Sequence, residues 1–185
     1  MSATTSASPD RIRSAAPADL QNLLQLIHLK ADFDGCPNAV TATAAKLEKT
    51  LFSPLPMAHI LLVDADQQTD LKALPLGFAS YHFTYSTFRA QPSIWLDDLF
   101  VRAEYRNQSI GAQLIQQLCQ IAADRDCGRI DWTVNIHNQA GIRFYQRLGG
   151  KLQTQVHLCR LDLAAIGENC ANAQHSYGQP SKKQP

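Results

Sequence analysis

The chain has 185 residues, of which 45% are hydrophobic and 18% charged, and 17 basic against 16 acidic residues give a formal net charge of +1. This length and composition are typical of a globular domain with its own core and exclude a wholly disordered polymer. The balanced charge argues against a nucleic-acid-coating surface, and no apolar run reaches the ~18 residues of a membrane span. We therefore expect neither nucleic acid nor a membrane as a partner.

The five cysteines are irregularly spaced and form no CxxC pair, and the histidines show no metal-binding spacing. We therefore expect no metal site, reduced thiols and a cytoplasmic protein. Residues 1–10 lack the apolar segment of a signal peptide, and residues 167–185 are rich in Asn, Gln, Ser, Gly and Pro. Both ends are predicted to be disordered tails on a single folded domain at residues 11–166.

The apolar pattern predicts strands and helices in alternation. In chain order we expect a strand at 11–15, a helix from about 17, a helix at 39–52, strands at 59–65, 76–86 and 94–101, a helix at 110–123, a strand at 129–135, a helix at 138–148 ended by Gly149 and Gly150, and one or two strands at 152–163. A polar turn is expected at 64–75. This order predicts an α/β sandwich around a mixed sheet.

Two adjacent carboxylates, Asp97 and Asp98, interrupt the apolar strand IWLDDLFV. Because successive strand residues point to opposite faces, each face of the sheet is expected to receive one carboxylate. A carboxylate inside a core is costly unless it is paired or lines a wet cavity. The pair therefore favours a site for a cation, and the alternative is an edge strand with solvated ends.

A polar loop precedes the helix that begins near Ser109. The start of a helix exposes unpaired N–H groups and a partial positive charge, which together suit an anion such as a pyrophosphate. The backbone donors would come from Arg106, Asn107, Gln108, Ser109, Ile110, Gly111 and Ala112. An ordinary helix with Asn107 or Ser109 as its N-cap is the alternative.

The segment NIHNQAGIRFYQRLGG places Tyr145 seven residues after Asn138, on nearly the same helix face. A phenol has a reference pKa of about 10, close to that of a leaving alkyl thiol, and can lend it a proton. A core tyrosine packed beside Phe144 is the alternative.

These segments together resemble a known family. YRNQSIGAQLI after an acidic strand, followed by DWTVNIHNQAGIRFYQRLGG, resembles the acetyl-coenzyme A half of the GNAT superfamily of N-acetyltransferases. GFASYHFTYSTF, IWLDDLFVRAEYR and IRSAAPADLQNLLQLI resemble its diamine (spermidine/spermine) acetyltransferase branch. The resemblance spans residues 11–163 and implies a mixed, mostly antiparallel central sheet, flanked by helices on both faces, with two splayed central strands.

The resemblance also implies roles for individual residues. The loop from Arg106 to Ala112 would bind the pyrophosphate of acetyl-coenzyme A, Asn138 its pantetheine, and Tyr145 would be the general acid. The other residues implied are Leu99, Phe100 and Val101 along the pantetheine arm and Asp34, Asp97 and Asp98 around the amine substrate. Asn107 and Ser109 stand where the family has glycines, which predicts a weaker or slightly reshaped cofactor site.

We therefore expect an acetyl-coenzyme A-dependent N-acetyltransferase in which a primary amine attacks the thioester directly. The acceptor would be a small cation, namely a diamine, a polyamine or a lysine-like amino acid. The alternatives are a non-catalytic module that binds coenzyme A or a metabolite, and an enzyme that acetylates a protein N-terminus or lysine side chain. The resemblance further implies a homodimer.

Overall fold

The computed structural model describes residues 11–65 and 73–177. The predicted tail at 1–10, the end of the chain from 178 and most of the predicted polar turn at 64–75 lie outside these residues. The chain divides into two units, Met1–Ile142 and Arg143–Pro185. Within the described residues, no helix is both long enough and apolar enough to cross a membrane.

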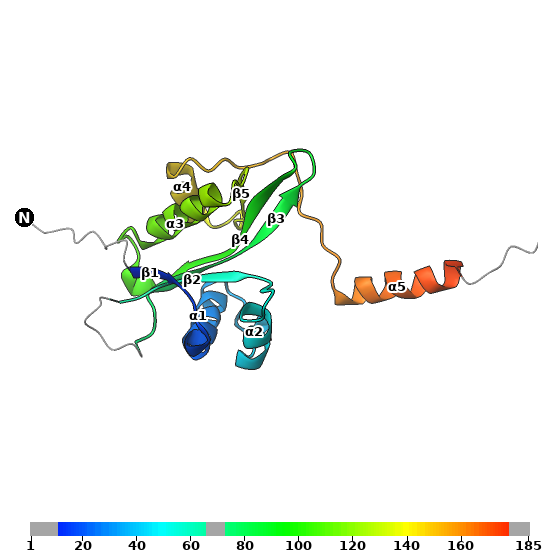
Figure 1. The fold of residues 1–185 in the computed structure, drawn as a ribbon, viewed down its shortest axis with the longest axis horizontal. Coiled ribbons are helices and arrows are strands. Elements are labelled where there is room, and N and C mark those ends of the chain that lie inside the picture. The colour runs from blue at the N-terminus through cyan, green and yellow to red at the C-terminus, as the bar shows by residue number, and fades with distance from the viewer. Residues whose placement is uncertain (1–10, 66–72, 178–185) are drawn as a thin grey trace, which may run out of the picture. The chain divides into compact units, whose positions relative to one another are not determined.

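The first unit is built on a five-stranded sheet with the strand order β1-β2-β3-β4-β5 (Figure 1). The strands are β1 (Ile12–Ser14), β2 (His59–Val63), β3 (Gly77–Ser86), β4 (Gln91–Val101) and β5 (Ile130–Asp131). The first four pair in antiparallel fashion, and β5 runs parallel to β4. The sheet is therefore mixed and mostly antiparallel, as predicted.

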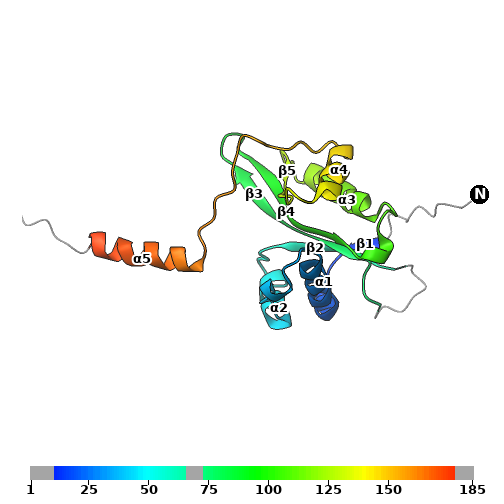
Figure 2. The same cartoon turned by 180° about the vertical axis from the view of Figure 1, so that it is seen from behind.

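Helices cover both faces of this sheet (Figures 1 and 2). Helices α1 (Leu20–Phe33) and α2 (Ala44–Leu51) lie on one face, and α3 (Ile110–Asp124) lies on the other. Leu23 and Leu26 of α1 pack with Phe78 in one buried cluster. The α3 side has a second cluster, which confirms the predicted sheet flanked by helices on both faces.

The sequence explains the bounds of α3 and α2. The four buried residues of α3 recur every four positions, at Ile110, Leu114, Leu118 and Ala122. The helix predicted at 110–123 is confirmed to within one residue. Helix α2 begins later than predicted, because Thr43 is extended and its Oγ1 accepts a hydrogen bond from the Lys46 N–H at 3.2 Å.

A β-bulge lies in the middle of β4. Ser80 of β3 pairs with Asp98 and Tyr81 pairs with Leu96, so Asp97 is the extra residue. The bulge shifts the alternation of side chains by one. Leu96 is consequently buried on the α3 side, whereas Phe100 is buried on the α1 side.

Strands β4 and β5 separate shortly after they meet. Only Ile94 and Trp95 of β4 pair with β5, although β4 continues to Val101. The strand predicted at 129–135 is therefore reduced to Ile130–Asp131, because its later residues have no ladder to join. This parting agrees with the two splayed central strands that the family resemblance implies.

Helix α4 (Gln139–Arg147) crosses from the first unit into the second. It ends as predicted, with Gly149 at φ +88° and the Gly150 N–H donating to the Tyr145 carbonyl at 2.9 Å. The predicted strands at 152–163 are wrong: the structure has no strand in residues 151–162.

A helix, α5 (Leu163–Tyr177), replaces the disorder predicted from residue 167. The missed signal is Asp162, whose Oδ1 accepts a hydrogen bond from the Ala165 N–H at 2.9 Å and caps the helix start. The expectation of one acetyltransferase domain over residues 11–166 stays a prediction.

Candidate functional site

Two of the predicted substrate-binding carboxylates meet at the C-terminal end of α1, and a lysine joins them. Lys30 Nζ lies 2.6 Å from Asp34 Oδ2 and 2.8 Å from Asp98 Oδ1. Asp34 follows the last residue of α1, and Asp98 comes from β4 just after the bulge. We call Lys30, Asp34 and Asp98 the acidic cluster. The third predicted carboxylate, Asp97, is exposed to solvent.

Burial and ion pairing together set the pKa values of the acidic cluster. Burial raises the pKa of Asp98, and the hydrogen bond from Lys30 acts in the opposite direction without cancelling it. Burial also lowers the pKa of Lys30, but the bonds to Asp34 and Asp98 outweigh it and hold the ammonium charged. A carboxylate with a raised pKa is a better proton acceptor than an ordinary aspartate, which is the property that a general base needs.

The loop before α3 has a backbone suited to an anion. Asn107 and Ser109 adopt φ of 60° and 63°, the left-handed region that glycine enters most easily. The first helical bond runs from the Gln113 N–H to the Ser109 carbonyl, so the N–H groups of the first turn have no acceptor within the helix. Ser109 occupies the N-cap position without a capping bond from its side chain. These features fit the phosphates of acetyl-coenzyme A.

Arg106 braces this loop against the end of α1. Its Nε donates to the Val101 carbonyl at 2.9 Å, and its guanidinium lies 4.2 Å from the centre of the Phe33 ring. The ring of Phe33 also lies 6.3 Å from that of Phe100. The Arg106 side chain thus links β4, the loop and α1, and its backbone N–H donates to the Ala103 carbonyl at 3.3 Å. A contact of Arg106 with pyrophosphate stays a prediction.

The predicted pantetheine segment at the end of β4 has two kinds of side chain. Phe100 is buried in the core on the α1 side, whereas Leu99 and Val101 are partly buried against the cluster on the α3 side. Any contact of Phe100 with a cofactor would therefore come from its backbone.

Asn138 lies immediately before α4, one residue ahead of its first residue. Its Oδ1 accepts a hydrogen bond from the Gly141 N–H at 2.9 Å, and a Cβ at Gly141 would lie 2.7 Å from Nδ2 of the same asparagine. Tyr145 belongs to the second unit, and its ring packs against Phe144 with centroids 5.1 Å apart. The roles of both residues stay predictions.

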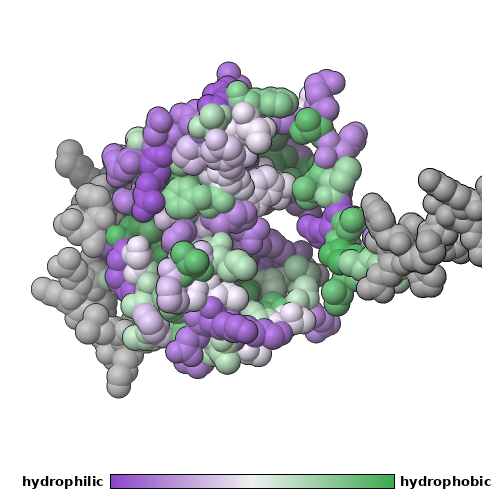
Figure 3. All heavy atoms as spheres, turned by 45° about the vertical axis from the view of Figure 1, so that its right-hand side comes forward, coloured by the Kyte–Doolittle hydropathy of each residue, from purple (hydrophilic) through white to green (hydrophobic). Residues whose placement is uncertain are grey.

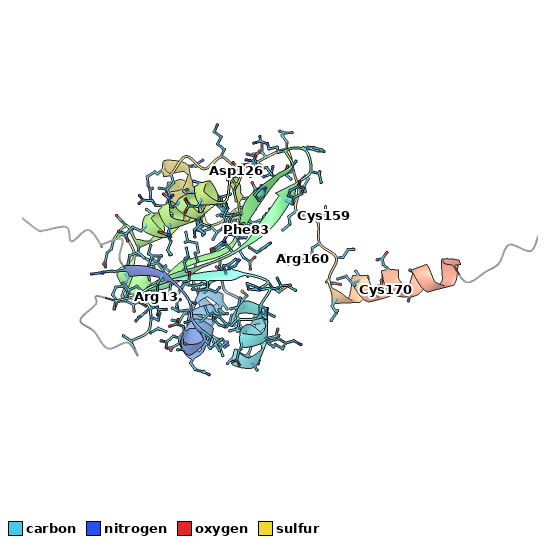
Figure 4. The ribbon with its side chains drawn as sticks, viewed as in Figure 1. Arg13, Phe83, Asp126, Cys159, Arg160 and Cys170 are labelled. Carbon is cyan, nitrogen blue, oxygen red and sulfur yellow. The ribbon has the colours of Figure 1, made fainter. Side chains whose placement is uncertain are left out.

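A separate pocket of about 480 Å³ lies between α3 and strands β1 to β3. Its lining includes Arg13 of β1 and Phe83 of β3, both labelled in Figure 4, together with His59 and Arg125. None of the predicted site residues lines it. Figure 3 shows hydrophilic and hydrophobic side chains interspersed over the face that it draws.

Sequence reasoning missed Lys30 and Phe33. The spacing of four residues between Lys30 and Asp34 is a helical ion-pair signal that was present in the sequence. The contact of Lys30 with Asp98 joins α1 to β4, and no local pattern predicts it.

Comparison with known proteins assigns the family. The model of the Acetyltransferase (GNAT) family matches residues 26–150, and the chain belongs to this family. The predicted class of enzyme, an acetyltransferase, is therefore confirmed.

Individual relatives agree with this assignment. The chain is 28% identical over 162 residues to a thialysine N-epsilon-acetyltransferase of Bos taurus, with 85% of this chain and 95% of that protein covered. It is 34% identical over 140 residues to a spermidine/spermine N(1)-acetyltransferase-like protein 1 of Homo sapiens, covering 75% of this chain but only 20% of that protein. An integron cassette protein of V. cholerae shares the fold, with a TM-score of 0.69 at 22% identity over 86% of this chain and 96% of that one.

Proposed function

We propose that this chain transfers an acetyl group from acetyl-coenzyme A to a primary amine of a small cationic molecule. The observation that carries the proposal is the acidic cluster, in which an alkylammonium, that of Lys30, already sits between two carboxylates next to the bulge of β4. An amine substrate presents the same chemical group. Two of the relatives support the proposal, since they are named as acetyltransferases of small amines: thialysine and spermidine/spermine.

The residues of the loop and of β4 would hold the cofactor. When bound, acetyl-coenzyme A supplies a thioester carbonyl that an uncharged amine attacks. The first-turn N–H groups of Ile110, Gly111 and Ala112, with the backbone of the preceding loop, would bind the pyrophosphate. A backbone N–H near Leu99 or Phe100 would donate to the developing oxyanion.

The carboxylates of β4 would prepare the acceptor amine. An alkylamine has a pKa near 10 and is mostly protonated, hence unreactive, at neutral pH. Asp98 would attract the ammonium and take its proton directly or through water, assisted by Asp97. Tyr145 would then give a proton to the departing thiolate.

A coenzyme A release assay with a panel of amines tests the proposal. The panel contains aminopentanol, cadaverine, spermidine, thialysine and lysine, and the mass of each product shows which amine was acetylated. Thiol release with a matching acetylated amine is the expected result. Acetyl-coenzyme A binding without release would instead indicate a non-catalytic module, and acetylation of a peptide alone would indicate a protein acetyltransferase.

Replacing Tyr145 separates chemistry from packing. We expect Tyr145→Phe to lower kcat by about a hundredfold, the usual scale of a lost general acid, with an unchanged Kd for acetyl-coenzyme A. Phe144→Leu, which removes the neighbouring ring, is the matched control and should keep most of kcat. A parallel fall of kcat and cofactor affinity in Tyr145→Phe would reduce the tyrosine to a packing residue.

We further infer a cytoplasmic homodimer. All five cysteines are free thiols, which supports a reducing compartment. The dimer rests on the resemblance to the diamine acetyltransferase branch. Light scattering of the purified chain should give twice the mass of 20.4 kDa, and a mass of one chain would contradict the dimer.

A further inference from the structure

We propose that Lys30 determines substrate specificity by taking the place of a second ammonium group, so that the site selects against diamines and polyamines. This inference rests on the proposed function. It narrows the acceptor to a molecule with one ammonium group near the acidic cluster.

The geometry of Lys30 is that of a bound cation. Its Nζ bridges Asp34 at 2.6 Å and Asp98 at 2.8 Å, and only 24% of its side chain is exposed. A surface lysine that paired with Asp34 alone would extend its side chain along the surface of α1. The second contact reaches across to β4 and turns the lysine inward.

The charge count gives the direction of selection. Asp34 and Asp98 contribute two negative charges and Lys30 one positive charge, so the acidic cluster keeps a net charge of −1. This remaining charge attracts one ammonium group, since the neighbouring Asp97 is exposed to solvent, where its charge is largely screened. A second ammonium would have to displace Lys30 from both carboxylates or lie beside its like charge, and like charges repel strongly in a partly buried site.

The surroundings of Lys30 keep it in this position. Phe33, three residues on, is held under the guanidinium of Arg106 at 4.2 Å, and Arg106 is itself bonded to the Val101 carbonyl. The C-terminal turn of α1 is thereby tied to β4 and to the loop. Lys30 therefore belongs to a braced end of the helix.

A matched pair of acceptors tests the inference. Cadaverine and aminopentanol have the same carbon chain, but only cadaverine carries a second ammonium. The quantity measured is the ratio of kcat/KM for cadaverine to that for aminopentanol. In the full wild-type chain we expect this ratio to be at or below about one, since Lys30 repels the second charge.

Substitution at Lys30 should change this ratio in a charge-dependent way. Lys30→Met should raise it about tenfold, the effect of removing one nearby like charge in a partly exposed site. Lys30→Arg keeps the charge and should keep the ratio of the wild type, whatever its effect on the absolute rates. Lys49→Met, which removes an exposed lysine of α2, is the matched control and should also leave the ratio unchanged.

The outcomes separate this inference from the proposed function. Two results would overturn the role of Lys30 and leave the proposed function standing. One is turnover of both amines with a ratio that Lys30→Met leaves unchanged, and the other is a wild-type ratio far above one. The wild-type ratio decides the matter even if Lys30→Met does not fold. Absence of turnover with every amine in the wild type overturns the proposed function and this inference with it.

Discussion

A carboxylate forms an ion pair at each end of helix α1, but the pKa values of the two carboxylates shift in opposite directions. At the N-terminal end, Asp19 accepts two hydrogen bonds from Arg13 at 2.7 and 2.8 Å and one from the Ala16 N–H at 2.7 Å. These bonds lower the pKa of Asp19, and the bonds from Arg13 have the largest effect. At the C-terminal end, Asp98 faces Lys30, and its pKa is raised because burial outweighs that contact.

The difference lies in how fully each carboxylate is compensated. Asp19 has hydrogen bonds on both oxygens, in the paired geometry that an arginine fork provides, and its ionised form is therefore favoured. Both cations are shared, Arg13 with Asp64 and Lys30 with Asp34, but the contact of Lys30 reaches Asp98 on Oδ1 alone. A fully compensated carboxylate stabilises the fold, whereas an undercompensated one keeps the capacity to bind a cation and to accept a proton.

Asp98→Asn should have the largest effect and should leave the fold nearly unchanged. We expect kcat/KM for a cationic amine to fall about a hundredfold, the scale of a lost general base. The free energy of unfolding should change by less than about 1 kcal/mol, because the ion pair is partly exposed and Lys30 keeps Asp34. Steady-state kinetics and urea denaturation measure the two quantities. A variant with normal kinetics would remove Asp98 from the site.

Asp19→Asn should show the reverse pattern at the other end of α1. The fold should lose about 1–2 kcal/mol, because the charge-assisted hydrogen bonds from Arg13 to Asp19 are weakened, although Arg13 keeps Asp64 as a partner. The kcat/KM of the folded fraction should stay that of the wild type. Glu48→Gln, an exposed acidic position on α2, is the control for loss of charge. An equal loss in the control would contradict the assigned role of Asp19.

The pH dependence of stability should differ in sign between the two carboxylates. The pKa of Asp19 in the folded protein lies below the ordinary value of 3.8, so its stabilisation is complete above pH 3.8 and disappears as the pH falls through the lowered value. The pKa of Asp98 lies above 3.8, so its contribution is most favourable below pH 3.8 and is lost as the pH rises through the raised value. Urea denaturation of Asp19→Asn and Asp98→Asn across acidic pH should show opposite trends relative to the wild type. Parallel trends would contradict the comparison.

Ser109→Gly should have the smallest effect. A serine at φ 63° is strained, and glycine relieves this strain. We expect a gain of about 0.5–1 kcal/mol in unfolding free energy and an unchanged or tighter Kd for acetyl-coenzyme A. Ser86→Gly, at the last residue of β3, is a matched control that should not stabilise the fold, since the φ of Ser86 is not positive and there is no such strain to relieve. Weaker cofactor binding by Ser109→Gly would show that the serine hydroxyl contributes to the site.

The sequence predicted the parts of the fold that follow from local periodicity. The apolar helix face that includes Leu114 and Leu118 predicted α3, and the apolar run around Asp97 and Asp98 predicted β4. The bulge was not predictable, because a doubled aspartate in a strand gives the same pattern with or without an extra residue. Its position follows from the pairing of β4 with β3, which is a tertiary property.

The candidate site was predicted in outline. Asp34 and Asp98 were assigned to one site from the family resemblance. In the structure both carboxylates form ion pairs with the ammonium of Lys30. Lys30 was missed because its partner on β4 is distant in sequence. The prediction of strands at 152–163 was wrong for a related reason. Alternating apolar residues form a strand only where a neighbouring strand hydrogen-bonds to them.

One measurement tests the central claim most directly: the fate of a labelled acetyl group. The full chain is incubated with acetyl-coenzyme A labelled in the acetyl carbonyl and with aminopentanol, and the products are identified by mass. The account predicts that the label moves to the amine in equal amount to the coenzyme A released, and that Asp98→Asn slows this transfer about a hundredfold. Label found only in free acetate, or transfer at the wild-type rate by Asp98→Asn, would contradict it.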